Sequence, residues 1–352
     1  MGIGDRLKAI IGRAKGAAPD LPTAVVIPAD HVVGGAAPPE LTSEERYFRV
    51  LLNQLWLAEE REWFTTWDPM ALIVTEFRYR GERTSVPYIV GRGTLEKKLG
   101  HALPGSMLLD DTYVAGLYPY MGAPVEITVV LYKVQRDNYA RALLGMVEKA
   151  SSIFPFASSL DLYLDVADVV LDGVEAVLGI DGTEPVFGRY HSLHSSAPAS
   201  IGSGYFALVD DDVDPADLWV SANQLHWRDE QGALQPFRGA DFLLYSVGSS
   251  TERDDVDSLS FTLLVKEALA EAQDPSEDAR KRAKAAMVSA FAAMIKSHDL
   301  IYSQSERLRD KYLARLASEL DRGNALANLS EVEPEDPRRA AALYQATKIL
   351  DL

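Results

Sequence analysis

The stretch "ALIVTEFRYRGERTSVPYIVG", residues 71–91, decides the fold class of this chain. Two runs rich in β-branched and aromatic residues, 71–80 and 86–91, flank the polar segment "GERTS". Such a pattern predicts two antiparallel strands joined as a hairpin. The runs "TYVAGLYPY" and "VEITVVLYKV", on either side of "MGAP" at 121–124, predict a second hairpin by the same reasoning.

A helix is expected directly before these hairpins. Thr42 and Glu45 have the spacing of a capping box, and they precede the run "RYFRVLLNQLWLAEEREWF". This arrangement predicts a helix from about 43 to 64, with Trp56 and Trp63 on its buried face.

The whole chain is expected to be an α+β protein with two β-rich, mainly antiparallel modules separated by a central helical segment. Strand patterns return in "PVFGRYHSL", "GYFALV", "LWV", "QLHW" and "DFLLYSV". Four later segments have helical patterns, which favours a C-terminal bundle or appendage: 258–273, 277–297, 303–322 and 336–350. The expected organisation is a basic amphipathic helix at 1–16, a linker at 17–41, an α+β module at 42–135, central helices at 136–182, a β-rich module at 183–250 and a helical region at 251–352.

Composition excludes several classes of function. The chain of 352 residues has a formal net charge of −17, so its body should repel nucleic acid and anionic lipid at long range. It contains no cysteine, which rules out disulfides, thiolate metal sites, iron–sulfur clusters and a cysteine nucleophile. The sequence shows no apolar run long enough to span a membrane and no apolar signal core. We therefore expect a cytoplasmic protein, with peripheral contact at a membrane as a further option.

The segment "DLYLDVADVVLDGVEAVLG", residues 161–179, combines a helical apolar pattern with a narrow acidic seam. Its acids fall at spacings of four and three residues, which places them on one side of a helix. Residues 150–188 contain no Lys or Arg. A solvated strip is the plain interpretation and a divalent cation is a second, but the missing counter-charge favours a basic partner. The acids of the seam are Asp161, Asp165, Asp168, Asp172 and Glu175.

The first sixteen residues, "MGIGDRLKAIIGRAKG", predict a basic amphipathic helix. Four basic side chains against Asp5 leave it at +3, opposite in sign to the chain as a whole. The Ala/Pro/Gly-rich stretch after it is typical of a flexible linker. The helix is thus a core element, a membrane-surface helix or the basic partner of the acidic seam. Its candidate contact residues are Ile3, Arg6, Leu7, Lys8, Ile10, Ile11, Arg13 and Lys15.

This opening resembles the N-terminal amphipathic helix of the phage-shock-protein-A family, whose members typically begin Met-Gly-Ile and use that helix on membranes. The resemblance covers the first helix alone, and the rest of the chain lacks the long coiled-coil hairpin of that family. It implies membrane contact by this helix and nothing about the remaining residues.

Two short segments contain residues of the kinds that bind metal ions. "RYHSLHSS" places His191 and His194 three residues apart, where both could ligate zinc in a helix but would point to opposite faces of a strand. "DDDVDPAD" clusters carboxylates, the ligands that calcium prefers, with Asp210, Asp212 and Asp214 as candidates. The plain alternatives are surface or core histidines and a solvated acidic turn.

The calcium hypothesis does not fit an EF-hand. Pro215 and Ser221 stand where that loop needs glycine and glutamate. A loop site of another kind could add carboxylates from "ERDDVDSL" at 252–259.

Taken together, these patterns predict a non-enzymatic interaction or assembly protein. The phosphate-loop, nucleophile-elbow and zinc-protease motifs are absent from the sequence, while opposite charges are segregated along it. The expected partners are a second copy, another protein or a membrane surface, but not nucleic acid, and no cofactor is expected. One alternative is a metal-dependent, hydrolase-like enzyme with calcium or zinc at 191–217 and 254–257. A further alternative is a membrane-perturbing effector acting through residues 141–180.

Overall fold

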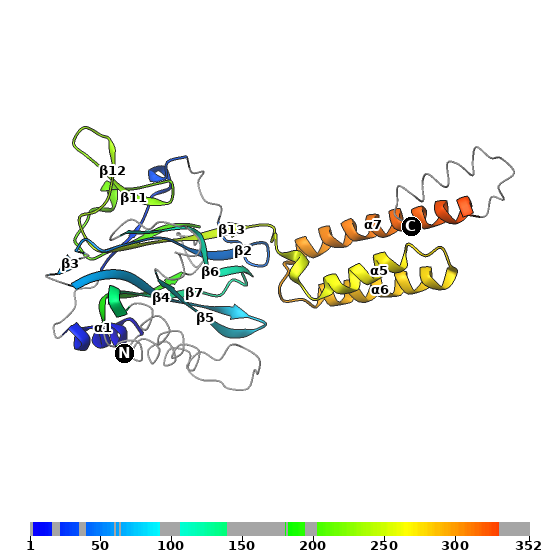
Figure 1. Ribbon diagram of the computed structural model, residues 1–352, viewed down its shortest axis with the longest axis horizontal. Coiled ribbons are helices and arrows are strands. Elements are labelled where there is room, and N and C mark those ends of the chain that lie inside the picture. Colours follow the sequence, from blue (N-terminus) through cyan, green and yellow to red (C-terminus); the bar gives the residue numbers. More distant parts are fainter. Residues whose placement is uncertain are drawn as a thin grey trace. The chain divides into compact units, whose positions relative to one another are not determined.

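The structure, a computed structural model, describes residues 3–15, 22–34, 40–59, 61–62, 65–91, 106–138, 180, 182–193 and 203–330. Contacts between residues divide the chain into two units, Met1–Glu252 and Arg253–Leu352. Within the described residues, the strands all lie in the first unit and the second unit is helical (Figure 1). The chain is therefore an α+β protein with mostly antiparallel sheets.

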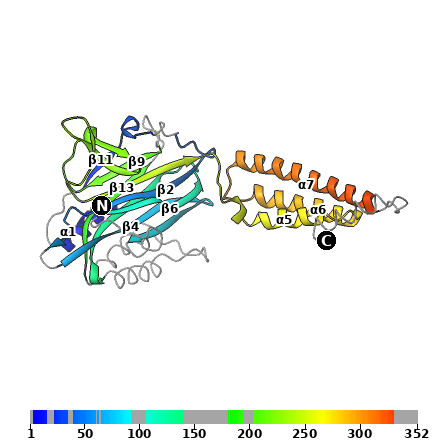
Figure 2. The same cartoon turned by 45° about the horizontal axis from the view of Figure 1, so that its top comes forward.

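Two antiparallel sheets form the body of the first unit, and Figures 1 and 2 show them stacked. The first sheet has the strand order β1 (Thr23–Val26), β9 (Gly204–Val209), β13 (Phe242–Ser250), β2 (Tyr47–Trp56) and β6 (Ser106–Pro119). The second sheet has the order β3 (Arg61–Glu62), β4 (Thr65–Tyr79), β7 (Val125–Gln135) and β8 (Thr183–Leu193), with β5 (Glu82–Gly91) paired to β4. A third, smaller sheet contains β10 (Leu218–Ser221), β11 (Gln224–Arg228) and β12 (Leu234–Pro236).

The main core of the first unit lies between the first and second sheets. Buried apolar side chains from both sheets meet there, among them Leu52 of β2, Ile73 of β4, Val129 of β7 and Tyr245 of β13. Successive residues of a strand point to opposite faces, so packing in this core requires only every second residue to be apolar.

The opposite face of the second sheet is buried as well. Leu72 and Val74 of β4, and Val130 and Tyr132 of β7, alternate with core residues of the same strands, yet each is at most 1% exposed. A strand that is buried on both faces needs a continuous apolar run. For this reason residues 70–74 of β4 read "MALIV", without the polar alternation of a half-exposed strand.

The hairpin predicted from residues 71–91 is confirmed. Strands β4 and β5 pair antiparallel, and Tyr79 pairs with Glu82 across a turn of Arg80 and Gly81. Both turn residues have a positive φ, 55° and 84°, as tight two-residue hairpin turns require.

The second predicted hairpin is wrong, although both of its strands exist. Strand β6 pairs with β2 in the first sheet, whereas β7 pairs with β4 and β8 in the second. The segment "MGAP" between them therefore carries the chain from one sheet to the other. Local sequence predicts that two strands follow each other, but their pairing depends on distant neighbours.

The helix predicted over 43–64 is also wrong, because this stretch forms β2. Thr42 and Glu45 close a turn instead of capping a helix, with the Glu45 N–H donating to the Thr42 carbonyl at 3.3 Å. Strand β2 lies between β13 and β6, and nearly all of its residues are buried. A run that is apolar on both sides suits such a central strand as well as it suits a helix, and here the strand pairing decides.

The structure also differs from the predicted pair of separate β-rich modules. Strands β2 and β6 come from 42–135, and β9 and β13 come from 183–250, yet all four lie in the first sheet. Within the predicted linker at 17–41, strand β1 pairs with β9. Of the predicted central helices, everything from 139 to 179 lies outside the described residues.

Three helices with a core of their own form the described part of the second unit (Figure 2). They are α5 (Phe261–Glu271), α6 (Glu277–Ile295) and α7 (Tyr302–Ser330). They confirm the helices predicted at 258–273, 277–297 and 303–322, while the one predicted at 336–350 lies outside the described residues. In the part of the chain that the structure describes, no helix is both long and apolar enough to cross a membrane.

Candidate functional site

The N-terminal helix α1 (Ile3–Lys15) packs against strand β8 through its apolar side. Leu7 and Ile11 are each 1% exposed, and Ile10 is 6% exposed. Gly188 of β8 makes this close packing possible, because a Cβ at that position would overlap the end of the Ile11 side chain. The helix predicted at 1–16 therefore exists, and its apolar side covers part of the second sheet.

The basic side chains of α1 lie on its outward side. Arg6, Lys8 and Arg13 are exposed. Near the end of the helix, the Lys15 Nζ donates to the carbonyl oxygen of Val186 at 2.7 Å. The exposed charged side chains of α1 are thus mostly basic, in a protein whose formal charge is −17.

This docking bears on the three interpretations of the first helix. Leu7, Ile10 and Ile11 are buried in the first unit, as expected of a core element. The physical reason is that the outer face of the second sheet is itself apolar and gains stability when an amphipathic helix covers it. The acidic seam predicted at 161–175 lies outside the described residues, so it stays a prediction.

His191, a candidate zinc ligand, lies between the two large sheets. Its Nδ1 is 3.0 Å from the hydroxyl of Tyr245 on β13, and its ring meets Phe206 of β9 edge to face with the centroids 5.3 Å apart. This is the environment of a hydrogen-bonded core histidine. His194 lies outside the described residues.

The aspartates of "DDDVDPAD" form a turn beyond the end of β9. The Asp214 carboxylate accepts the Ala216 N–H at 2.9 Å, and the Asp211 carboxylate accepts the Asp212 N–H at 2.8 Å. Asp210 follows Phe206 by four residues of extended chain, about 13 Å, so it lies far from the histidine that contacts Phe206. Among the described residues, no group of three or more His, Asp or Glu side chains is arranged to hold a metal ion.

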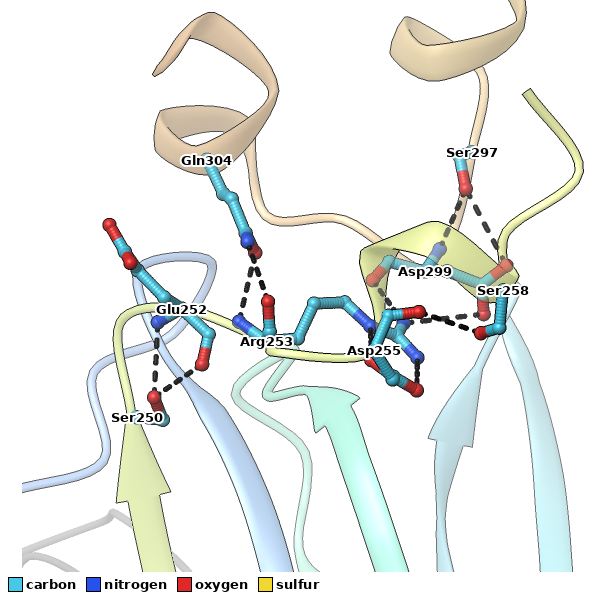
Figure 3. Close-up of polar contacts among 8 residues, drawn as sticks. All are labelled: Ser250, Glu252, Arg253, Asp255, Ser258, Ser297, Asp299 and Gln304. Atoms are coloured by element: carbon cyan, nitrogen blue, oxygen red, sulfur yellow. Dashed lines mark hydrogen bonds and ion pairs between the residues drawn. The ribbon is translucent and has the colours of Figure 1, made fainter. Parts of the chain in front are cut away.

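In the second unit, "ERDDVDSL" supplies an ion-pair network centred on Arg253 (Figure 3). The Arg253 side chain is 8% exposed, and its Nε and Nη2 donate to the two carboxylate oxygens of Asp255 at 2.6 and 2.7 Å. Its Nη1 donates to the carbonyl of Asp299 at 2.7 Å, and the backbone of Arg253 exchanges hydrogen bonds with the Gln304 amide. The guanidinium lowers the pKa of Asp255. The network joins the segment before α5 to the loop and first turn of α7, which is a structural role.

A pair of acidic residues on the second sheet, one of them buried, has no counterpart among the sequence predictions. Glu76 of β4 lies opposite Glu126 of β7. Glu76 is 1% exposed. Arg83 of β5 forms ion pairs with both carboxylates. Its Nη2 lies 3.5 Å from the Glu76 Oε2. The Ser85 hydroxyl donates to the Glu76 Oε1 at 3.3 Å, and Tyr190 of β8 is hydrogen-bonded to Glu126.

Burial sets the protonation chemistry of this cluster. It raises the pKa of Glu76, an effect that the positive charge of Arg83 opposes and the negative charge of Glu126 reinforces. Burial and the neighbouring Glu126 raise the pKa of Tyr190 to about 12. Such perturbed groups occur in proton-transfer sites and equally in structural ion-pair networks. The only signal in the sequence is a single acid inside an apolar strand.

Comparison with known proteins gives no family: no family model, no curated protein and no solved structure matches this chain.

Proposed function

We propose that this protein is a non-enzymatic interaction protein that self-associates through charged surfaces, with the outward side of α1 as one of them. The observation that carries this proposal is the way α1 is docked. Its apolar residues hold it on β8, while Arg6, Lys8 and Arg13 are exposed. A basic surface held in place on a strongly acidic protein attracts acidic surfaces, including those of a second copy.

The same geometry makes a membrane the weaker of the expected partners. Amphipathic helices bind membranes through buried apolar area together with attraction to anionic lipid. In the docked helix the apolar area is already used, since Leu7 and Ile11 are 1% exposed. Only the electrostatic part remains, and the net charge of −17 opposes it at long range.

The alternative of a metal-dependent hydrolase is favoured by no arrangement among the described residues. His191 is hydrogen-bonded to Tyr245, and Asp211 and Asp214 accept hydrogen bonds from their own turn. The alternative of a membrane-perturbing effector concerns residues 141–180, nearly all of which lie outside the described residues.

Reversing the charge of α1 tests the proposal. We expect the double variant Lys8→Glu/Arg13→Glu to shift the protein toward the monomer, because it replaces attraction to an acidic surface by repulsion. Light scattering coupled to gel filtration, at about 50 mM and at about 300 mM salt, measures the change, and the wild-type assembly should also weaken at the higher salt.

The matched control is Lys284→Glu/Lys296→Glu, which changes the net charge equally at two exposed lysines of the second unit. This control should keep the wild-type mass. A wild-type chain that is monomeric at low salt, or two double variants with the same mass, would contradict the proposal.

A further inference from the structure

Helix α6 has a second apolar side, which faces away from the core of the second unit. The core side of the helix is formed by Ala and Met side chains that are at most 2% exposed: Ala283, Met287, Ala290 and Met294. The second side, which we call the α6 seam, consists of exposed residues: Ala285, Val288, Ala292 and Ile295. At 3.6 residues per turn, the seam residues fall within roughly 80° of one another and about 150° from the core residues.

The α6 seam exposes large apolar side chains in a row. Val288 is 66% exposed and Ile295 is 71% exposed. A single exposed apolar residue is common on any protein surface, whereas the outer side of a surface helix is normally polar. A row that follows one side of a helix for about three turns is instead typical of a surface that binds a partner.

The spacing of the α6 seam indicates that the partner is a helix. Its residues are separated by three, four and three positions, which is the spacing with which one helix packs against another in a coiled coil. The two alanines leave shallow positions beside Val288 and Ile295, into which larger side chains of a facing helix can insert. The seam is narrow and contains no aromatic residue, which makes it a poor match for a membrane surface.

The charge around the α6 seam indicates the chemistry of that helix. From residue 279 to residue 296 the chain carries five basic side chains and no acidic one, although its formal charge as a whole is −17. Lys281, which extends the line of the seam by one turn, pairs only with Glu277 on the same exposed surface, at 2.8 Å. An exposed pair of this kind contributes little and is readily replaced. Acidic side chains beside the apolar residues of a partner would therefore be attracted to this surface.

We propose that the α6 seam is the docking surface for an amphipathic helix of another protein, one with Asp and Glu on both sides of its apolar residues. A second copy of α6 fits less well, because it would bring five further basic side chains to the contact. This surface belongs to the second unit, whereas the proposed self-association uses α1 of the first.

A synthetic helix tests the proposal with the full chain. The probe is a fluorescein-labelled peptide of about 21 residues, with Leu and Ala at coiled-coil spacing and Glu on both flanks. Fluorescence anisotropy at about 50 mM salt should show that it binds, and that a counterpart with Lys in place of Glu does not. Val288→Glu/Ile295→Glu should weaken the binding at least about tenfold, because it places like charges in the contact.

The matched control is Leu263→Glu/Leu313→Glu, which makes the same change of charge at exposed apolar positions of α5 and α7. This control should bind the acidic peptide as the wild type does. Since Val288 and Ile295 are exposed, their variant should keep the wild-type circular dichroism spectrum. If it does not, Val288→Ser/Ile295→Ser repeats the test with a milder change.

The remaining outcomes overturn the proposal. An acidic peptide that does not bind, or that binds both double variants equally, shows that the seam is no docking surface. Equal binding of the Lys peptide shows that the stated partner chemistry is wrong. A native mass that falls in Val288→Glu/Ile295→Glu would identify a second copy as the occupant. Co-sedimentation with phosphatidylserine vesicles that is lost in the same variant would identify a membrane.

Discussion

At the scale of single residues, Glu76 shows how this fold changes the chemistry of a side chain. Its carboxyl is buried between strands, and desolvation raises its pKa despite the ion pair with Arg83. The folded chain therefore holds this proton more tightly than the unfolded chain does. The raised pKa of Glu76 therefore contributes to the free energy of unfolding at low pH, where the carboxyl is neutral. This contribution is lost as the pH rises through the pKa of Glu76 in the folded chain.

Replacing Glu76 by Gln removes this ionisation and tests its cost. As the pH rises from about 4 to about 8, only the wild type must ionise a buried group at this position. We therefore expect the free energy of unfolding of Glu76→Gln to increase relative to that of the wild type over this range. Urea unfolding followed by tryptophan fluorescence measures the difference. Glu82→Gln, exposed on β5, is the control and should follow the wild-type profile. Parallel curves for Glu76→Gln and wild type would show that the burial of Glu76 carries no such cost.

At the scale of elements, strand pairing outweighs local helix signals in the first unit. Strand β2 carries an apparent capping box and a long apolar run, yet it pairs with both β13 and β6. The capping motif predicts a helix only where no better partner exists for the backbone, and here two neighbouring strands supply one. The C-terminal helices show the opposite case, because their apolar residues need only neighbouring helices and local periodicity predicts them correctly.

Arg253 ties the segment before α5 to the start of α7. We expect Arg253→Lys to lower the free energy of unfolding of the second unit by about 1.5–3 kcal/mol, because an ammonium group cannot form the two-pronged contact with Asp255. Thermal unfolding followed by circular dichroism at 222 nm measures the loss. Arg315→Lys, at an exposed position of α7, should change it by less than about 0.5 kcal/mol. Equal effects of the two substitutions would show that the network adds nothing to stability.

At the scale of the whole molecule, the two units have separate cores. The core between the first and second sheets draws on residues up to Val247, and the helical core begins with Val256. All five tryptophans precede residue 253, so tryptophan fluorescence reports on the first unit alone.

Separate cores predict that the second unit folds by itself. A fragment of residues 253–352 should show a helical circular dichroism spectrum, with a cooperative thermal transition within a few degrees of the one that the full chain shows at 222 nm. A fragment without cooperative unfolding would mean that the helices depend on the first unit. The tryptophan transition of the full chain serves as the reference for the first unit.

Local sequence patterns predicted the first hairpin, several further strands, the basic amphipathic helix at the N-terminus and three C-terminal helices. These features depend on periodicity and turn chemistry among residues close together in the chain. Only the tertiary structure decided that β2 is a strand, that early and late strands share both large sheets, and that α1 covers β8. The contact of Lys15 with Val186 joins residues 171 positions apart, and Gly188 matters only because Ile11 lies on it. Such contacts depend on which distant surfaces meet, and no local pattern contains that information.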